Sequence, residues 1–136
     1  MILSMLSVQQ DIDRLVNRNR VFFKHRRSFR DAMQNDITKL GSQYGFRSVK
    51  EYRVIKSNGS NGFIDVAWLD QGNLVLAIEI DSSLRANSME KLSMLPREVE
   101  RLWLCYSPSE IDVREYEDKI NGLVMKYEFT FTRLRS

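Results

Sequence analysis

Three acidic residues in apolar segments are the strongest chemical signal in this chain. Asp65 interrupts the run Gly62-Phe-Ile-Asp-Val-Ala-Trp-Leu69, and Glu79 and Asp81 end the run Leu74-Val-Leu-Ala-Ile-Glu-Ile-Asp81. Both runs are typical of buried strands. A carboxylate in such a strand is costly to desolvate unless a positive charge meets it. We therefore expect a cation close to these acids.

The distance between the acids depends on how the two strands pair. A three-residue loop over 71–73 would place residue 70 opposite residue 74 and Asp65 opposite Glu79, about 5 Å apart. Like charges at that distance repel unless a divalent cation bridges them. Magnesium suits one or two carboxylates completed by water and substrate phosphates. A slip of one residue would send the two acids to opposite faces.

Two further acids are weaker candidates. Glu51 lies in a segment rich in Val, Ile and Tyr that predicts a strand over 48–56. It could complete the metal shell, or pair with Arg53 on the same face, and we favour the ion pair. Asp36 could point into the site from the preceding helix, but a place on the exposed helix face is the simpler expectation.

A basic run near the N-terminus is a candidate nucleic-acid-binding surface. It contains no acid and comprises Arg14, Arg18, Arg20, Lys24, Arg26, Arg27 and Arg30. Guanidinium and ammonium groups in such a run could contact a phosphate backbone. An ordinary solvated helix face is the alternative. His25 lies in the run without a second ligand at a recognisable spacing.

The elements that must position these residues follow from hydrophobic periodicity. It predicts two helices, over 4–20 and from Ser28 to Gly45, followed by three strands over 48–56, 63–69 and 74–81. A helix capped by Ser82 or Ser83 then ends before Pro96. The chain continues with a strand over 101–106, a helix over 107–125 and an edge strand over 127–134. We expect an α/β fold in a single domain over 1–136, with a basic helical arm over 1–27 and a core over 28–136.

Composition limits the class of protein. The chain has 136 residues, 43% of them hydrophobic and 29% charged, with a net charge of +3. These values suit one globular domain. No run approaches the length of a membrane helix, the apolar N-terminus is a poor signal peptide, and the single cysteine, Cys105, predicts a buried thiol. We expect a cytoplasmic protein without a membrane partner. The apolar N-terminal helix could serve a homodimer or pack on its own core.

The order of elements and acids resembles the PD-(D/E)xK nuclease superfamily, and in particular archaeal Holliday junction resolvases and related small endonucleases. Gly62-Phe-Ile-Asp65 matches the family's Gly-x-hydrophobic-Asp segment, and Ala77-Ile-Glu79-Ile-Asp81 matches its hydrophobic-Glu-x-Lys segment. The resemblance covers about residues 29–106. It implies a restriction-endonuclease-like α-β-β-β-α-β core with a mixed sheet flanked by helices, extended by an N-terminal helix and a C-terminal α-β unit.

The sequence departs from the family at the motif lysine, where it has Asp81. That lysine normally orients or activates the attacking water. Lys56 and Lys91 are candidate substitutes, and Arg85 and Ser88 could face the site or the nucleic-acid backbone from the same helix as Lys91. Alternatively, Asp81 adds a metal ligand and catalysis relies on metal-bound water.

The resemblance implies a nuclease that hydrolyses phosphodiester bonds with Mg²⁺ or Mn²⁺, acting on nucleic acid, with double-stranded or branched DNA favoured. The expected metal ligands are Asp65, Glu79, Asp81 and Glu51, the expected catalytic residues are Asp65, Glu79, Asp81, Lys56 and Lys91, and the expected nucleic-acid contacts are Arg20, Lys24, Arg26, Arg27, Arg30 and Arg85. A catalytically inactive binding or assembly module of the same fold is the main alternative. A protein-interaction domain is the third.

Overall fold

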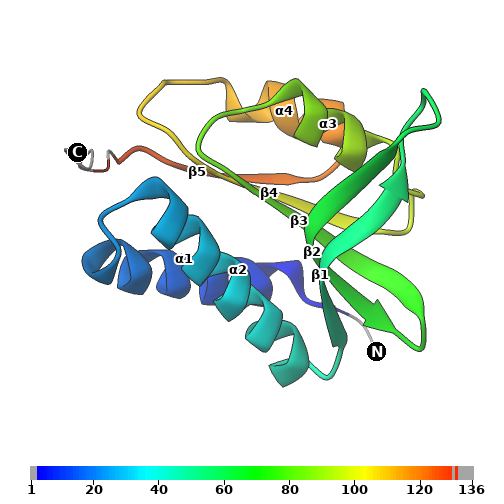
Figure 1. Cartoon of the computed structure of the whole chain (residues 1–136), viewed down its shortest axis with the longest axis horizontal. Coiled ribbons are helices and arrows are strands. Elements are labelled where there is room, and N and C mark those ends of the chain that lie inside the picture. Colours follow the sequence, from blue (N-terminus) through cyan, green and yellow to red (C-terminus); the bar gives the residue numbers. More distant parts are fainter. Residues whose placement is uncertain (1–2, 130, 132–136) are drawn as a thin grey trace.

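A mixed sheet between two pairs of helices forms the protein (Figure 1). The computed structural model describes residues 3–129 and 131. Its elements are α1 (Met5–Phe22), α2 (Arg26–Gln43), β1 (Arg47–Ile55), β2 (Asn61–Asp70), β3 (Asn73–Asp81), α3 (Ala86–Ser93), β4 (Glu100–Tyr106), α4 (Val113–Ile120) and β5 (Leu123–Tyr127). The expected α/β class is confirmed.

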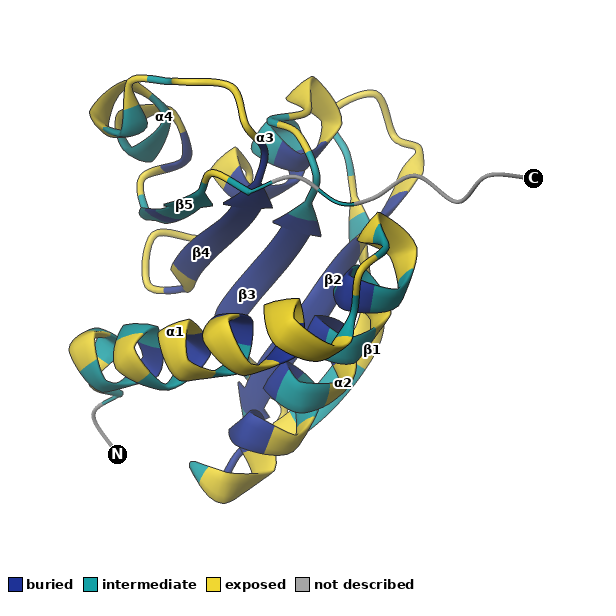
Figure 2. Cartoon of the chain, turned by 90° about the vertical axis from the view of Figure 1, so that its left-hand side faces the viewer, coloured by how far each residue is buried: buried dark blue, intermediate teal, exposed yellow. Residues whose placement is uncertain are grey.

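The five strands lie in the order β1-β2-β3-β4-β5. The first three pair antiparallel through two hairpins, whereas β4 and β5 run parallel to β3. Parallel neighbours need a crossover, and α3 and α4 supply the two crossovers. Helices α1 and α2 cover one face of the sheet, while α3 and α4 cover the other (Figures 1 and 2). The central strand β3 is therefore covered on both faces.

Helix α1 belongs to the main hydrophobic core. Its residues Val8, Ile12 and Val16 are fully buried and join a cluster with α2 and one face of the sheet (Figure 2). The apolar stripe at helical spacing thus packs on its own chain. No helix among residues 3–129 and 131 has the length and apolar character needed to cross a membrane.

Several predicted boundaries were wrong. Ser28 does not cap α2: the helix begins at Arg26, and the Ser28 hydroxyl donates to the carbonyl of His25. Helix α3 begins at Ala86, after Arg85, rather than at Ser82 or Ser83. Gly45 does follow α2, in a left-handed conformation with φ +87°.

The C-terminal elements also differ from the prediction. The last helix is short because Asp112 caps its N-terminus and Asn121 ends it in the left-handed region, with φ 53°. The last strand is Leu123–Tyr127, parallel to β4, and it does not include residues 128, 129 and 131 of the predicted strand over 127–134. Alternation of aromatic and polar residues after Tyr127 misled the assignment, and positions 130 and 132–134 of the predicted strand lie outside the described residues.

The hairpin between β2 and β3 reaches its register by an unexpected route. The turn has two residues, with Asp70 opposite Asn73, instead of the predicted three-residue loop. A bulge between Trp68 and Leu69 then shifts the register by one residue. The last regular pair is Val66 with Ile78, so the next residues of the two strands are Asp65 and Glu79. The bulge thereby restores the register in which the two acids meet.

Close packing of α2 on the sheet yields a stability prediction at Gly41. A β-carbon at this position would overlap Ser48 Oγ and the indole of Trp68. Alanine normally stabilises a helix relative to glycine, but here we expect Gly41→Ala to lower the free energy of unfolding by about 2 kcal/mol because the core cannot yield. Urea unfolding would measure the change. Ser42→Ala, at the exposed neighbouring position, is the matched control. Equal stability of Gly41→Ala and the wild type would contradict the packing.

Candidate active site

Strands β2 and β3 separate beyond the pair Val66–Ile78, and two carboxylates fill the gap. Glu79 Oε1 accepts a hydrogen bond from the backbone N–H of Asp65 at 3.0 Å. Asp65 Oδ2 accepts one from the backbone N–H of Ile80 at 2.7 Å. The side chains therefore satisfy backbone groups that the separated strands no longer pair. Of the residues singled out in the sequence, Asp65 and Glu79 are thus brought together.

Strand β2 also twists at the point where it separates from β3. Val66 packs in the core beneath α1 and α2, whereas Ile64 packs with Leu92 on the other face of the sheet. Residues two apart in a strand normally share a face, so the strand rotates around Asp65. On the neighbouring strand β1, Glu51 lies between the pairs Lys50–Val66 and Tyr52–Ile64 and has a left-handed backbone with φ 54°. Irregular backbone on two strands thus frames Asp65.

Each buried carboxylate has a basic partner. Asp65 and Glu79 are 8% and 1% exposed, so neither can rely on water for its solvation. Arg30 Nη2 lies 2.5 Å from Asp65 Oδ1, and Lys91 Nζ lies 3.0 Å from Glu79 Oε2. Lys91 is itself buried and also donates to the carbonyl of Phe63 at 2.6 Å. Two acids and two bases thus form one compact charged cluster.

Burial changes the proton affinities of both acids. Burial, and next the negative charge of Asp65, raises the pKa of Glu79 to about 7, and Lys91 opposes the rise. Burial also raises the pKa of Asp65, although the Ile80 N–H and Arg30 favour its charged form. A carboxylate that holds its proton near neutral pH is common where a site is built for chemistry or for a cation.

Asp81, which the resemblance aligns with the motif lysine, anchors a helix. Its Oδ2 accepts hydrogen bonds from Ser88 Oγ at 2.6 Å and from Trp103 Nε1 at 2.9 Å. Ser88 lies one helical turn before Lys91, and both side chains are buried on the same face of α3. The bond from Ser88 to Asp81 therefore fixes the helix that brings Lys91 to Glu79.

Glu51 does not pair with Arg53, which corrects the predicted ion pair. Its Oε1 instead lies 3.5 Å from Arg30 Nη2 and accepts a hydrogen bond from Gln34 Nε2 at 3.1 Å. Gln34 also donates to the carbonyl of Asp65 at 2.9 Å. The reason is the left-handed backbone of Glu51, which breaks the alternation on which the prediction rested.

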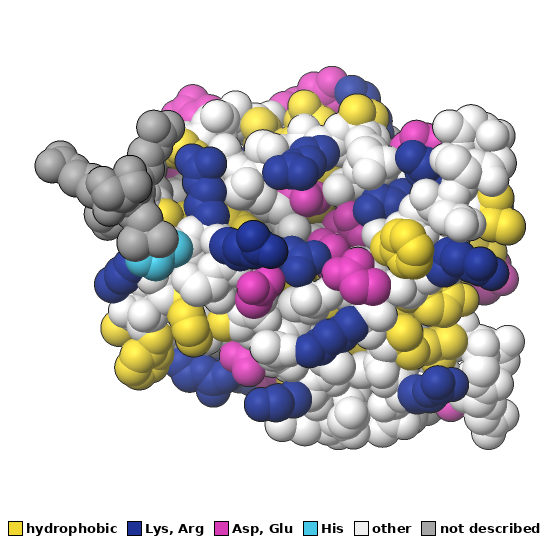
Figure 3. Space-filling model, in the orientation of Figure 1, with side chains coloured by type: hydrophobic (Ala, Val, Ile, Leu, Met, Phe, Trp, Pro, Cys, Tyr) yellow, Lys and Arg dark blue, Asp and Glu magenta, His cyan; other side chains and the backbone are white. Residues whose placement is uncertain are grey.

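A cavity of about 350 Å³ opens beside these residues. The residues that line it come from α2, β2, the end of β3, the segment that joins β3 to α3, α3 and β4: Arg26, Arg27, Arg30, Asp65, Glu79, Ile80, Asp81, Ser82, Arg85, Asn87, Ser88, Lys91 and Tyr106. Lysine and arginine side chains border acidic ones on the face seen in Figure 3. An acidic centre with a basic rim suits a phosphate group that approaches a cation.

Three basic candidates lie outside this lining. Arg20 packs over the ring of Phe129, with its guanidinium carbon 4.9 Å from the ring centroid. Lys24 Nζ lies 3.5 Å from the carbonyl of Arg20. Lys56 Nζ reaches the side chain of Asn87 at 3.3 Å, at the edge of the site. Of the two candidate substitutes for the lysine, Lys91 is the one that contacts Glu79.

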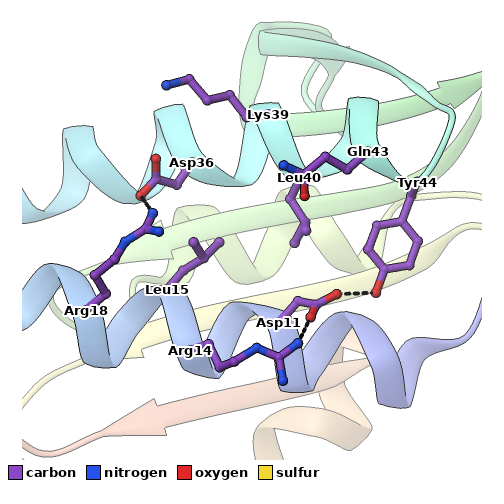
Figure 4. Close-up of a pocket in the computed structure, with 9 residues that line it drawn as sticks. All are labelled: Asp11, Arg14, Leu15, Arg18, Asp36, Lys39, Leu40, Gln43 and Tyr44. Carbon is purple, nitrogen blue, oxygen red and sulfur yellow. Dashed lines mark hydrogen bonds and ion pairs between the residues drawn. The ribbon is translucent and has the colours of Figure 1, made fainter.

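Asp36 lies in a different cavity, between α1 and α2 (Figure 4). Its Oδ2 accepts hydrogen bonds from Arg18 Nη2 and Asn19 Nδ2, both at 2.9 Å. Arg14 pairs with Asp11, whose other oxygen accepts from the hydroxyl of Tyr44 at 2.5 Å. Much of the positive charge on α1 is thus balanced locally.

The chemistry of the donor set suits a hard cation at Asp65 and Glu79. Each has one oxygen bound to the backbone and one bound to a protein cation, so a metal ion could reach each carboxylate only at the oxygen that Arg30 or Lys91 now holds. Two carboxylates completed by water and phosphate match the coordination of Mg²⁺. The four expected ligands do not converge: among residues 3–129 and 131 no group of three or more His, Cys, Asp or Glu side chains is placed to hold a metal.

Several site residues were missed in the sequence. Gln34, Trp103 and Tyr106 complete the surroundings of the acids, and the sequence offers only a weak signal for them. The position of Gln34 four residues after Arg30, one helical turn, was the available clue. Trp103 and Tyr106 were assigned to an apolar strand, which hides their polar atoms.

No protein-family model matches the chain, and neither does any curated protein or solved structure.

The raised pKa of Glu79 predicts how stability depends on pH. The folded protein holds this proton up to about pH 7, whereas the unfolded chain releases it near 4.5. Folding is thus favoured at low pH, and the free energy of unfolding falls as the pH rises between these values. Glu79→Gln should remove about 2 kcal/mol of that fall, measured by urea unfolding from pH 5 to pH 8.

Glu110→Gln is the control, because Glu110 is exposed and should leave the pH dependence of the wild type intact. An unchanged slope in Glu79→Gln would show that Glu79 titrates normally and would contradict the assigned environment.

Proposed function

We propose that this protein is a metal-dependent nuclease of the PD-(D/E)xK type, which hydrolyses phosphodiester bonds in DNA. The proposal rests on one observation: Asp65 and Glu79 meet in a gap between two central strands, with Lys91 on Glu79. The succession α2-β1-β2-β3-α3-β4 supports a restriction-endonuclease-like core. In that interpretation α1 is an N-terminal addition, and α4 with β5 a C-terminal one.

Lys91 is our candidate for the role of the motif lysine. It reaches Glu79 from α3, whereas the family places this lysine two residues after the glutamate on the strand. An ammonium group 3.0 Å from the glutamate can orient a water molecule and offset negative charge that develops on the phosphate. Asp81 then acts as a positioning residue through Ser88.

Asp65 and Glu79 would hold Mg²⁺ or Mn²⁺, together with the carbonyl of Ile80, which lines the same cavity. When bound, the ion lowers the pKa of its water and offsets phosphate charge. Backbone hydrogen bonds fix one oxygen of each carboxylate, so that neither carboxylate must reorient to present its other oxygen. Their burial excludes competing solvent.

The basic rim of the cavity supports a nucleic acid as the substrate. Arg26, Arg27 and Arg85 are exposed and line the cavity around the acids. Such residues bind phosphates without reading base sequence. We therefore expect salt-sensitive binding that depends little on sequence, with double-stranded or branched DNA as the preferred form.

A nucleic-acid-binding module without catalysis is the second candidate function. The observation that favours it is the pairing of both carboxylates with Arg30 and Lys91, which balances their charge without a metal ion. In that case the cavity would bind phosphates through its arginines, and the acids would serve to position those arginines.

Cleavage by carboxylate variants distinguishes the two functions. We expect the wild type to cut plasmid or branched DNA with Mg²⁺ or Mn²⁺, and Asp65→Asn and Glu79→Gln to lower the rate about a thousandfold, because each removes a metal ligand. Both substitutions keep the shape of the side chain. Gel assays of cleavage, with DNA binding measured in parallel, would test this.

Asp36→Asn is the control, since Asp36 has a similar pairing with an arginine but lies in another cavity. DNA binding by the wild type without cleavage under any metal condition would favour the binding module and reject the nuclease.

Lys91→Met tests the role given to the helix-borne lysine. We expect cleavage to fall about a hundredfold while DNA binding changes little, since the ammonium group acts on the reacting phosphate. Lys126→Met is a matched control: Lys126 is another largely buried lysine, held by the carbonyl of Ser107 at 2.5 Å and outside the cavity. Full activity of a folded Lys91→Met protein would exclude Lys91 from catalysis.

A further inference from the structure

Arg30 occupies the oxygen of Asp65 that a metal ion would use. Asp65 Oδ2 is bound to the backbone N–H of Ile80, so Oδ1 is the remaining oxygen, and Arg30 Nη2 lies 2.5 Å from it. A guanidinium and a divalent cation beside one oxygen repel each other strongly in a partly buried site. Metal binding therefore requires that Arg30 move.

A second position for this guanidinium already exists. Glu51 Oε1 lies 3.5 Å from the same nitrogen, and Asp31 Oδ1 lies 3.5 Å from Nη1. Gln34 holds Glu51 in place by a hydrogen bond of 3.1 Å and also accepts one from Arg30 at 3.1 Å. The left-handed backbone of Glu51, uncommon outside glycine, occurs where its carboxylate approaches Arg30. Arg30 can thus leave Asp65 by a short movement and keep a carboxylate partner.

We propose that Arg30 is a cation gate. In this proposal, which rests on the proposed nuclease function, Arg30 binds Asp65 in the metal-free protein and shifts toward Glu51 or a substrate phosphate when a divalent cation binds. Arg30 lines the cavity, and a guanidinium can bind a phosphate through two hydrogen bonds.

The gate couples cation and substrate. A phosphate that attracts Arg30 frees Asp65 Oδ1 and so raises the affinity for the metal ion, and by linkage the metal ion raises the affinity for the phosphate. The site would then assemble fully only on nucleic acid, which limits metal binding in its absence.

Titration of the full chain with MnCl₂ alone, followed by calorimetry or by electron paramagnetic resonance of the free ion, tests the gate. We expect Arg30→Gln to lower the Kd for Mn²⁺ about tenfold, because the competing charge is gone. Arg18→Gln is the matched control: it removes an arginine from an ion pair with Asp36, outside this cavity, with the same change of net charge. Its Kd should equal that of the wild type.

Glu51→Gln provides a second variant at a half-exposed side chain. It removes the alternative partner of Arg30, so Mn²⁺ binding should weaken several-fold in the wild-type background and stay unchanged in the Arg30→Gln background. If Arg30→Gln fails to fold, the single variant decides: an unchanged Kd in Glu51→Gln overturns the gate.

Asp65→Asn separates failure of the gate from failure of the nuclease function. If Mn²⁺ binding requires Asp65 but Arg30→Gln leaves the Kd unchanged or raises it, the gate is overturned and the metal site stands. If Asp65→Asn binds Mn²⁺ as tightly as the wild type, or if neither the wild type nor Arg30→Gln binds it, both proposals are overturned.

Discussion

The separation of β2 from β3 is the constraint on which the site depends. Once the ladder ends at Val66 and Ile78, the backbone N–H groups of Asp65 and Ile80 need new acceptors in a buried place. The carboxylates of Glu79 and Asp65 supply them, and this fixes both side chains by one oxygen each. The second oxygen of each carboxylate has no backbone partner. Because both side chains are buried, this oxygen requires a positive charge nearby. Arg30 on α2 and Lys91 on α3 supply this charge from opposite faces of the sheet. The site therefore needs a helix on each face at this point.

Stability alone is a poor reason for such a cluster. Buried ion pairs repay their desolvation only in part, and well-packed apolar residues of similar volume are often as stable or more so. The neighbouring positions Ile64, Val66 and Ile78 show that the sheet can bury apolar side chains fully on either side of the gap. Charges retained among such residues, with the pKa of Glu79 raised to about 7 and a cavity beside them, favour a functional site over a structural one.

Much of this arrangement could be predicted from the sequence, and the parts that could not be predicted have physical causes. Asp65 and Glu79 were found because an acid in an apolar strand is costly, and the order of elements followed from periodicity. The predicted register of β2 and β3 agrees with the structure near the two acids, but it was derived from a three-residue loop that does not exist. Neither the two-residue turn nor the bulge after Trp68 has a distinct local signal in the sequence. The left-handed Glu51 was equally hidden, and with it the loss of the ion pair to Arg53. Lys56 and Lys91 were equivalent in the sequence, because only tertiary packing decides which of them reaches Glu79.

Asp81 and Lys91 together show how the buried Glu79 receives its positive partner. A lysine at position 81 would lie on the same face of β3 as Glu79, two residues away. The helix instead brings the ammonium group of Lys91 to 3.0 Å from Glu79, and its orientation depends on the hydrogen bond of 2.6 Å from Ser88 to Asp81. Asp81 therefore holds the helix that carries Lys91. A positive charge at a fixed place beside a buried glutamate can come from a strand or from a helix, provided that the element that carries it is anchored.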